Sequence, residues 1–505
     1  MRIRASTMKT TPAAVPPRSR RRALALLLAA TVLGGCATVG PDYAGPPALA
    51  VEGDWSQPDV ALPAGTAPAE LARWWETLGD PVLERLIGTA LERNLDLRQA
   101  MSRIDEARAL RDRTAGARAP TVAAGTSVNR RRQSENGALP IGSLPGLDAT
   151  QTIYDAGFDA AWEVDLFGGT RRALESAEAR LAATRIEAGG ARMRIAAEVA
   201  RTWFEAAGAA RELLAQQGTV RALEQTLELA RQRHALGDAS LADVETVAAQ
   251  WAAANAGLPE IEARQRAAVL ALGVLLGSGP DAELALLDVL PEAPTLSPLP
   301  VGERADVLRR RPDVRAAERQ LAASTAEIGV ATAELFPKLA IGAGGGFQAL
   351  DTGDWFDSSS ARFSILPMIS WRLFDGGRVR AKIRAREAAT ERAALAYEQT
   401  VLAALGDAER ALSDYRAGLE SLARRDLALQ ASLRSHAHAQ ARYAAGDIAL
   451  VELLAAERLL HEARQTQARA QSSAAVRLVA LYKALGGGWE APREEALAAA
   501  DRARS

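Results

Sequence analysis

The fold is decided by residues 154–166, which read YDAGFDAAWEVDL. Every second residue of this stretch is apolar, and the residues between them are mostly acidic. A period of two places alternate side chains on opposite faces of an extended strand. Residues 363–373, FSILPMISWRL, show the same period. Both stretches are therefore predicted to be strands with one apolar face and one polar face.

Each predicted strand has a weaker partner upstream. Alternation recurs in 122–128 and in 339–347, and a polar segment that contains Gly, Ser or Asp separates the two members of each pair, at 135–149 and 350–360. Such segments connect hairpins, so each half of the chain is expected to hold one hairpin. Pro367 within the last strand indicates a kink or bulge rather than a central ladder position.

The chain contains an internal sequence repeat. RHALGDASL at 233–241 matches RYAAGDIAL at 442–450, which lies 209 residues further on. DLRQA at 96–100 matches DVRAA at 313–317 with an offset of 217. Two consistent offsets indicate a tandem duplication with one net insertion of eight residues between the markers.

The predicted organisation follows from this duplication. The two repeats span roughly 80–277 and 306–486, and residues 278–305 link them. Residues 36–79 are expected to form an extended N-terminal segment. The tail, 487–505, is rich in Ala, Arg and Glu and is expected to be disordered.

Long helices are predicted after each strand pair. Residues 169–236 contain no proline and carry apolar residues at heptad spacing, and 377–445 is the matching segment. About 68 residues at 1.5 Å each give a rod on the order of 100 Å, which no compact domain requires. A shorter helix is expected over about 80–117, ended by Pro120. Residues 189–190, Gly-Gly, are a predicted weak point in the first rod.

Two sharp turns are predicted at the ends of the long helices. Gly237 and Gly446 stand where a glycine commonly ends a helix. Asp238 and Ser240 can cap the helix that follows the first turn. Asp447 is the counterpart of Asp238 after the second turn. Each repeat should therefore contain a tight helical hairpin.

A targeting signal precedes the mature chain. Four arginines within 18–22 are followed by a largely apolar segment, 23–32, which is too short to span a bilayer. Leu-Gly-Gly-Cys at 33–36 resembles a bacterial lipobox, so residues 1–35 are expected to be a lipoprotein signal peptide. The lipid would be attached to Cys36, the only cysteine. The alternatives are an ordinary signal peptide with a chance cysteine, and translation from Met8.

Composition excludes several classes of function. A net charge of −1 without a basic, aromatic-rich patch gives no reason to expect nucleic-acid binding. No phosphate loop, nucleophile elbow or zinc-protease motif occurs, so no enzyme, metal or cofactor is predicted beyond the covalent lipid. His436-x-His438 is a weak metal pattern, because positions i and i+2 do not share a helix face. All four histidines are expected on rod surfaces.

The strands imply an oligomer. Trp162 and Trp371 lie near strand ends, where aromatic residues meet a membrane interface. Only a closed barrel can span lipid, since an open sheet edge leaves peptide groups unpaired. Four strands cannot close a barrel, whereas two chains give eight strands and three give twelve with a pore. The alternative is a soluble periplasmic coiled-coil or adaptor lipoprotein.

Several ordered motifs carry a family resemblance. They are VGPDY at 39–43, WEVDLFG at 162–168, LRRRPDV at 308–314 and LFDGG at 373–377. In these stretches the chain resembles TolC-like outer-membrane factors of the NodT or OprM lipoprotein type. The resemblance implies an α+β homotrimer whose twelve-stranded transmembrane β-barrel, four strands per chain, continues into a long periplasmic α-helical barrel. It also implies a lipid-anchored, passive exit duct for small molecules such as drugs.

The resemblance further implies partners and residue roles. A periplasmic adaptor and an inner-membrane pump, usually of the resistance-nodulation-division class, would complete the efflux system. The strand-to-helix turns correspond to Gly168, Gly169, Gly376 and Gly377. The turns at Gly237 and Gly446 would form the periplasmic tip, where the family closes its channel and meets the adaptor.

One departure from the family concerns the gate. The family commonly has an acidic residue in Leu-Asp-Ala-Gln-Arg after the second tip turn, but residues 454–458 read LAAER, so Ala455 removes that charge. Asp243 and Glu452 occupy equivalent repeat positions. The hypothesis is that they supply an acidic ring instead. The alternative is that they only cap helices or face solvent.

Overall fold

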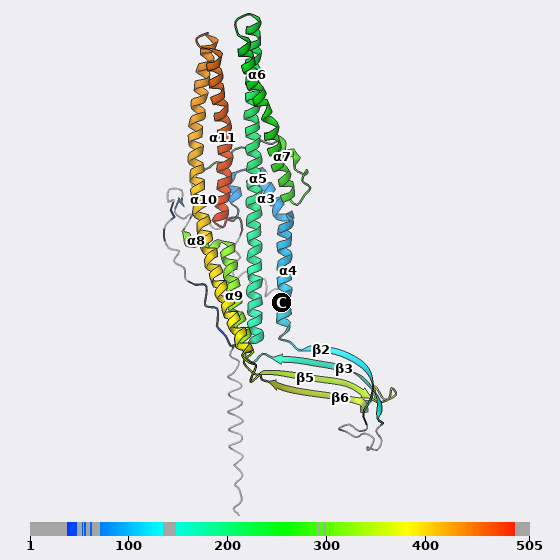
Figure 1. Ribbon diagram of the computed structural model, residues 1–505. Coiled ribbons are helices and arrows are strands. Elements are labelled where there is room, and N and C mark those ends of the chain that lie inside the picture. Colours follow the sequence, from blue (N-terminus) through cyan, green and yellow to red (C-terminus); the bar gives the residue numbers. More distant parts are fainter. Residues whose placement is uncertain are drawn as a thin grey trace, which may run out of the picture. The chain divides into compact units, whose positions relative to one another are not determined.

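The computed structural model describes most of the chain (Figure 1). The described residues are 38–47, 53, 55–56, 61–62, 71–134, 148–290, 292–296, 299–301 and 303–489. The predicted signal peptide, Cys36, most of the loop 135–149 and residues 490–505 of the predicted tail lie outside the described residues. The first residues of that tail, 487–489, are ordered, contrary to the prediction, because Trp489 is buried in a small hydrophobic cluster.

The four predicted strands form one antiparallel sheet. They are β2 (Thr121–Arg132), β3 (Thr150–Val164), β5 (Lys338–Ala349) and β6 (Ala361–Ser370), and their order is β2-β3-β5-β6. Figure 1 shows them side by side as a curved ribbon. Both predicted hairpins are confirmed by the pairing of β2 with β3 and of β5 with β6. The central pair, β3 with β5, joins the two repeats into a single sheet.

The proline in β6 does not cause the predicted bulge. The register between β5 and β6 advances one residue at a time past Pro367, which lies opposite Ile341. β6 is an edge strand of the sheet, with only β5 as its neighbour within the described chain. Proline is tolerated at a sheet edge because its missing N–H need not disturb a central ladder.

The described chain divides into two compact units. One unit contains the sheet, residues 38–44 and the adjoining helix ends within 110–178 and 322–390. The other contains the remaining lengths of the helices. None of the described helices combines the length and the apolar character that crossing a bilayer would require.

The first helix of each repeat is split, which the sequence analysis missed. α3 (Pro81–Arg93) and α4 (Leu95–Gly116) replace the single expected helix. Asn94 leaves helical geometry, and its side-chain oxygen accepts hydrogen bonds from the backbone N–H groups of Asp96 (2.9 Å) and Leu97 (3.1 Å). In the second repeat the break falls at Arg311, between α8 (Arg304–Arg310) and α9 (Pro312–Ala333). The residue before a proline disfavours helical geometry.

The two predicted rods are present. α5 (Gly169–Ala235) and α10 (Arg378–Ala444) each contain 67 residues, about 100 Å of helix. The weak point expected at Gly189 is wrong, because α5 continues through it. A Cβ at Gly189 would lie 2.4 Å from the ring of Trp489, so the glycine makes room for a packed indole.

The returning helices differ between repeats. In the first repeat, α6 (Leu241–Ala256) and α7 (Leu258–Leu275) are separated at Gly257, and Pro259 stands at the start of α7. In the second repeat, α11 (Leu450–Ala484) is unbroken. Figure 1 shows α11 beside α10, and α6 beside the far part of α5.

The main core lies in the unit built from the helices. Its largest fully buried side chains include Trp74, Trp203 and Tyr415, and Trp74 stacks on Tyr482 with ring centroids 4.8 Å apart. Short elements complete the structure: β1 (Ala61–Leu62), which pairs with β4 (Leu299–Pro300), and the 3-10 helices η1 (Trp74–Leu78), η3 (Leu284–Asp288) and η4 (Ser358–Ser360).

Candidate functional site

One face of the sheet is apolar and exposed. The strand register places Phe158, Ile365 and their apolar neighbours on the same side, and their side chains find no cover within the unit. Phe363 is 87% exposed and Ile365 is 71% exposed. Exposed apolar surface on this scale is unfavourable in water and marks a surface that meets lipid or another protein.

The other face of the sheet is polar and partly neutralised. Arg362 of β6 reaches across β5 to Asp155 of β3, with Nε–Oδ2 and Nη2–Oδ1 distances of 2.9 and 2.6 Å. Gly346 lies opposite Arg362 in the register and has no side chain to obstruct the pair. Gln348, which lies opposite Asp155, also donates to its carboxylate at 3.0 Å. Lys338 pairs with Glu163 at 2.9 Å. Two of the acidic side chains on this face therefore have basic partners.

The two tryptophans predicted for the membrane interface make equivalent hydrogen bonds. The indole N–H of Trp162 donates to the carbonyl oxygen of Arg118, and that of Trp371 to Leu335, both at 3.0 Å. Trp371 lies one residue beyond β6. Each indole thus satisfies its polar atom locally and leaves its ring partly exposed, as an interface aromatic requires.

Glycine residues and an aspartate side chain form the strand-to-helix turns. Gly168, Gly376 and Gly377 have φ of +77°, +65° and +84°, a region that other residues rarely adopt. Gly169 instead begins α5. The carboxylate of Asp375 accepts from the backbone N–H groups of Gly377 and Val379, both at 2.8 Å, so it caps the first turn of α10.

The tip turns have the predicted glycine geometry. Gly237 and Gly446 have φ of +84° and +81°, and the N–H of the residue after each bonds back to the helix. The Asp238 N–H donates to the Arg233 carbonyl at 2.8 Å, and the Asp447 N–H makes the corresponding bond at 2.9 Å. This pattern satisfies the last carbonyls of a helix. The guanidinium of Arg233 also lies 4.7 Å from the ring centre of Tyr443, a contact between the two hairpins.

The cap assignments at the tip are only partly correct. Ser240 caps α6, but the side chain of Asp238 is not its cap. Asp243 completes a capping box, since its carboxylate accepts from the Ser240 N–H at 3.0 Å and from the hydroxyl at 2.8 Å. Glu452 lies in the first turn of α11, whose N-cap residue, Ala449, provides no side-chain hydrogen bond. The two acids therefore occupy similar positions in different local settings.

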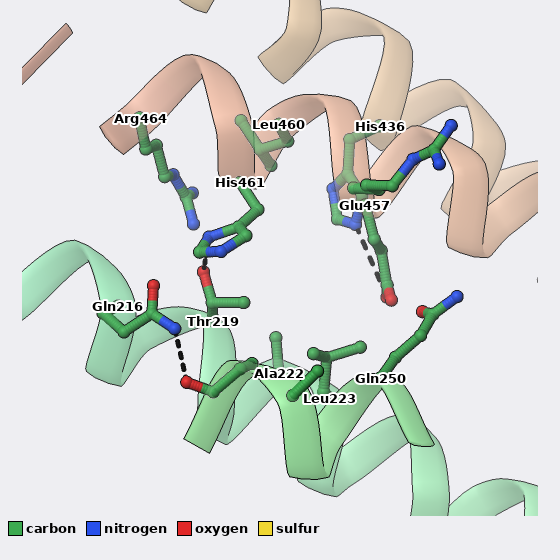
Figure 2. Close-up of a pocket in the computed structure, with 13 residues that line it drawn as sticks. Gln216, Thr219, Ala222, Leu223, Gln250, His436, Glu457, Leu460, His461 and Arg464 are labelled. Carbon is green, nitrogen blue, oxygen red and sulfur yellow. Dashed lines mark hydrogen bonds and ion pairs between the residues drawn. The ribbon is translucent and has the colours of Figure 1, made fainter. Parts of the chain in front are cut away.

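A cavity of about 620 Å³ lies between the two helical hairpins (Figure 2). Thr219 of α5 contacts His461 of α11 through the hydroxyl and Nδ1, and the Nε2 of His436 from α10 lies 3.8 Å from a carboxylate oxygen of Glu457. The prediction that all histidines lie on rod surfaces is wrong for His436 and His461, because both line this cavity. His234 and His438 are exposed.

The cavity disfavours charge. Burial raises the pKa of Glu457, against the opposing effect of His436 and a hydrogen bond from Thr226. Burial also lowers the pKa of His461, and the nearby positive charge of Arg464 lowers it further. Both groups are thus shifted towards their neutral forms, which suits an interface between packed helices.

A buried carboxylate joins three helices. Glu212 of α5, whose side chain is 2% exposed, lies 2.9 Å from the Nη2 of Arg264 in α7 and 2.9 Å from the Nε of Arg469 in α11. The two arginine side chains remain more than half exposed. No local sequence pattern pointed to this cluster, because its members are 52 and 257 residues from Glu212.

A sheet with an exposed apolar face, followed in the chain by helices of about 100 Å, defines the subunit of an outer-membrane channel. The family model described as Outer membrane efflux protein matches residues 86–278 and 304–487. The chain belongs to this family.

Individual relatives agree over nearly the whole length. The chain is 31% identical over 474 residues to the pyoverdine export outer membrane protein OpmQ of Pseudomonas putida, covering 93% of this chain and 98% of the relative. It is 31% identical to the outer membrane protein OprJ of Pseudomonas aeruginosa, covering 92% and 96%. The solved structure of the outer-membrane channel OprN is 34% identical, has a TM-score of 0.81 and covers 89% of this chain and 99% of that chain.

These findings establish the general role of the chain. It is an outer-membrane protein that serves as an efflux channel, and it is not an enzyme. The alternative of a soluble coiled-coil or adaptor lipoprotein is wrong, since an efflux component and a channel match 93% and 89% of the chain.

Proposed function

We propose that three copies of the chain assemble into one exit duct, each donating four strands to a twelve-stranded β-barrel. The observation that carries this proposal is the exposed apolar face of a sheet that has β2 and β6 as its edges. In lipid, both edges need partners, and the β6 edge of one copy can pair with the β2 edge of the next. Three copies give a pore, whereas two leave an interior filled by side chains.

The duct is passive and depends on partners for energy. The helical tips at Gly237 and Gly446 would meet a periplasmic adaptor, and an inner-membrane pump of the resistance-nodulation-division class would drive export. The cargo would be small organic molecules such as drugs. A wide polar lumen, lined by the face that carries Asp155 and Arg362, suits varied cargo because it offers no tight pocket.

Native mass spectrometry of the purified, detergent-solubilised protein tests the assembly. The expected result is a complex of three chains that resists dissociation at room temperature and separates on heating. A single chain that stays in solution without detergent would contradict the proposal.

Asp243 and Glu452 are proposed to narrow the closed tip with a ring of negative charge. Their equivalent positions after the two tip turns support this, while the capping box of Asp243 means that part of its carboxylate is already engaged. A shared acidic ring would attract cations and hold the opening small through bound counter-ions.

Replacing both acids by Ala should raise the single-channel conductance of the protein in planar bilayers, or raise drug leakage through the outer membrane. Asp243→Ala also removes the acidic member of the capping box of α6, so Asp243→Asn with Glu452→Gln is the matched variant that removes charge while retaining side-chain acceptors. Unchanged conductance in this matched variant would refute the acidic ring. An increase confined to the alanine pair would assign the effect to the lost capping box.

A further inference from the structure

The residues that follow Cys36 are clamped to the body of the protein by one buried arginine. Arg172, near the start of α5, has a side chain that is only 4% exposed. Its Nε donates to the Val39 carbonyl at 3.1 Å, and its Nη2 donates to the Gly40 carbonyl at 3.2 Å and to Asp42 Oδ1 at 2.6 Å. We refer to residues 38–42 as the strap.

Backbone contacts fix the strap as well. The Val39 N–H donates to the Phe167 carbonyl at 3.1 Å, beside the strand-to-helix turn. A Cβ on Gly40, whose φ is +88°, would lie 2.4 Å from the Cα of Gly329 in α9. A Cβ on Gly168 would lie 2.7 Å from Thr38. The strap therefore packs closely against the strand-to-helix turn and α9, where three glycines allow backbone to meet backbone.

The arginine is in an unfavourable place unless the strap is present. A cation in the first turn of a helix opposes the helix dipole, and burial removes it from water. Burial does act to lower the pKa of Arg172, but hydrogen bonds to Glu175 and Asp42 outweigh it and raise the pKa above its usual value. Glu175, at 2.8 Å, satisfies one side of the guanidinium, and the strap supplies the other acceptors.

We propose that Arg172 is a positioning residue for the lipid anchor: by locking the strap onto the strand-to-helix turn, it fixes the point at which acyl chains on Cys36 enter the membrane. This inference rests on the proposed lipidation of Cys36. Only one residue, Ala37, lies between Cys36 and Thr38, so at most about 7 Å of chain separates their Cα atoms. A lipid joined to the bound strap by so short a segment would set the depth of the sheet in the bilayer. If the strap were not bound, the lipid would only keep the protein near the membrane.

A double-mutant cycle tests whether Arg172 acts through the lipid. The four forms are the native protein, Arg172→Ala, a non-lipidated form made with Cys36→Ser behind an ordinary secretory signal peptide, and the combination. The first readout is the fraction of chains that form heat-modifiable oligomers in isolated outer membranes. Arg172→Ala should lower it about five-fold in the lipidated protein and less than two-fold in the non-lipidated one. Equal losses in both backgrounds would show a purely structural role and overturn the proposal.

Hydrogen exchange of the peptide that covers 38–47 is the second readout. The strap should stay protected in the non-lipidated form and lose protection in Arg172→Ala, since the arginine and not the lipid holds it. Loss of protection on removing the lipid alone would overturn the proposal. Arg378→Ala, which removes an exposed arginine from the first turn of α10, is the control and should leave the strap protected.

A variant of the strap itself covers the case in which Arg172→Ala does not fold. Gly40→Ala leaves Arg172 in place but pushes the strap against Gly329, so it should reproduce both effects. The same oligomer yield for Gly40→Ala and native protein would count against the proposal. The intact mass of the purified chain reports separately whether Cys36 carries lipid, and oligomers in the native sample report separately on the proposed assembly.

Discussion

Ile365→Arg is expected to abolish assembly in the outer membrane. Ile365 lies at the middle of β6 on the exposed apolar face. An arginine facing lipid near the bilayer midplane costs about 2–4 kcal/mol in a β-barrel, or about 6–12 kcal/mol for three copies. That sum is comparable with the whole stability of a typical protein. Outer-membrane fractionation and the shift of the band on heating before electrophoresis would measure the loss.

Ser364→Arg is the matched control, since it places the same side chain one residue away on the opposite face. Ser364 lies opposite Gly344 in the register, on the polar side of the sheet that also carries Asp159. The added charge should therefore face water, and oligomers should form at close to the native yield. If both variants assembled equally well, the apolar face would not be facing lipid.

The double variant Arg264→Ala with Arg469→Ala is expected to destabilise the helical unit strongly. Glu212 would then be a buried carboxylate without a partner, which in proteins costs about 3–5 kcal/mol. Because both arginines are more than half exposed, solvent already weakens each pair, so we expect the lower end, about 3 kcal/mol. A lower unfolding temperature in detergent would measure it. Glu212→Gln in the double-arginine background should recover most of the loss.

Lowering the pH is expected to affect the stability of the native protein and of the double-arginine variant in opposite directions through Glu212. Burial acts to raise the pKa of Glu212, but hydrogen bonds from Arg469 and Arg264 outweigh it and lower the pKa below its usual value. In the native protein, the ionised Glu212 and its two arginines thus contribute stability above the pKa that Glu212 has in the unfolded chain. This stability is lost as the pH falls through the lower pKa that Glu212 has in the folded protein. Without the arginines, burial alone raises the pKa, so acid should relieve the penalty. Unfolding temperatures between pH 7 and pH 4 should fall less in the variant than in the native protein.

Local chemistry made the elements of the fold predictable. Alternation in 154–166 and 363–373 determined strands, because a period of two leaves no helical alternative. Glycine at 237 and 446 determined the turns, because few other residues adopt positive φ. The split at Asn94 could also have been predicted, since asparagine is a favoured helix N-cap and Asn94 directly precedes Leu95, the first residue of α4.

Long-range pairing was not predictable from one sequence. The contact of Glu212 with Arg264 and Arg469 and the cavity at His436 and His461 bring together residues from different helices, and periodicity does not specify which helix faces meet. Gly189 was misread for the same reason. A glycine pair suggests a break until the indole that occupies its space is known.

The joint at Gly257 makes the two halves of the duplication mechanically unequal. One hairpin returns in two pieces, with a proline that removes a backbone donor, while its counterpart returns as a single column of 35 residues. Under a force across the helix axis, the α6–α7 segment should bend at Gly257 before the continuous α11 bends. In the trimer proposed above, the ring of helices would then contain three compliant and three stiff returning members.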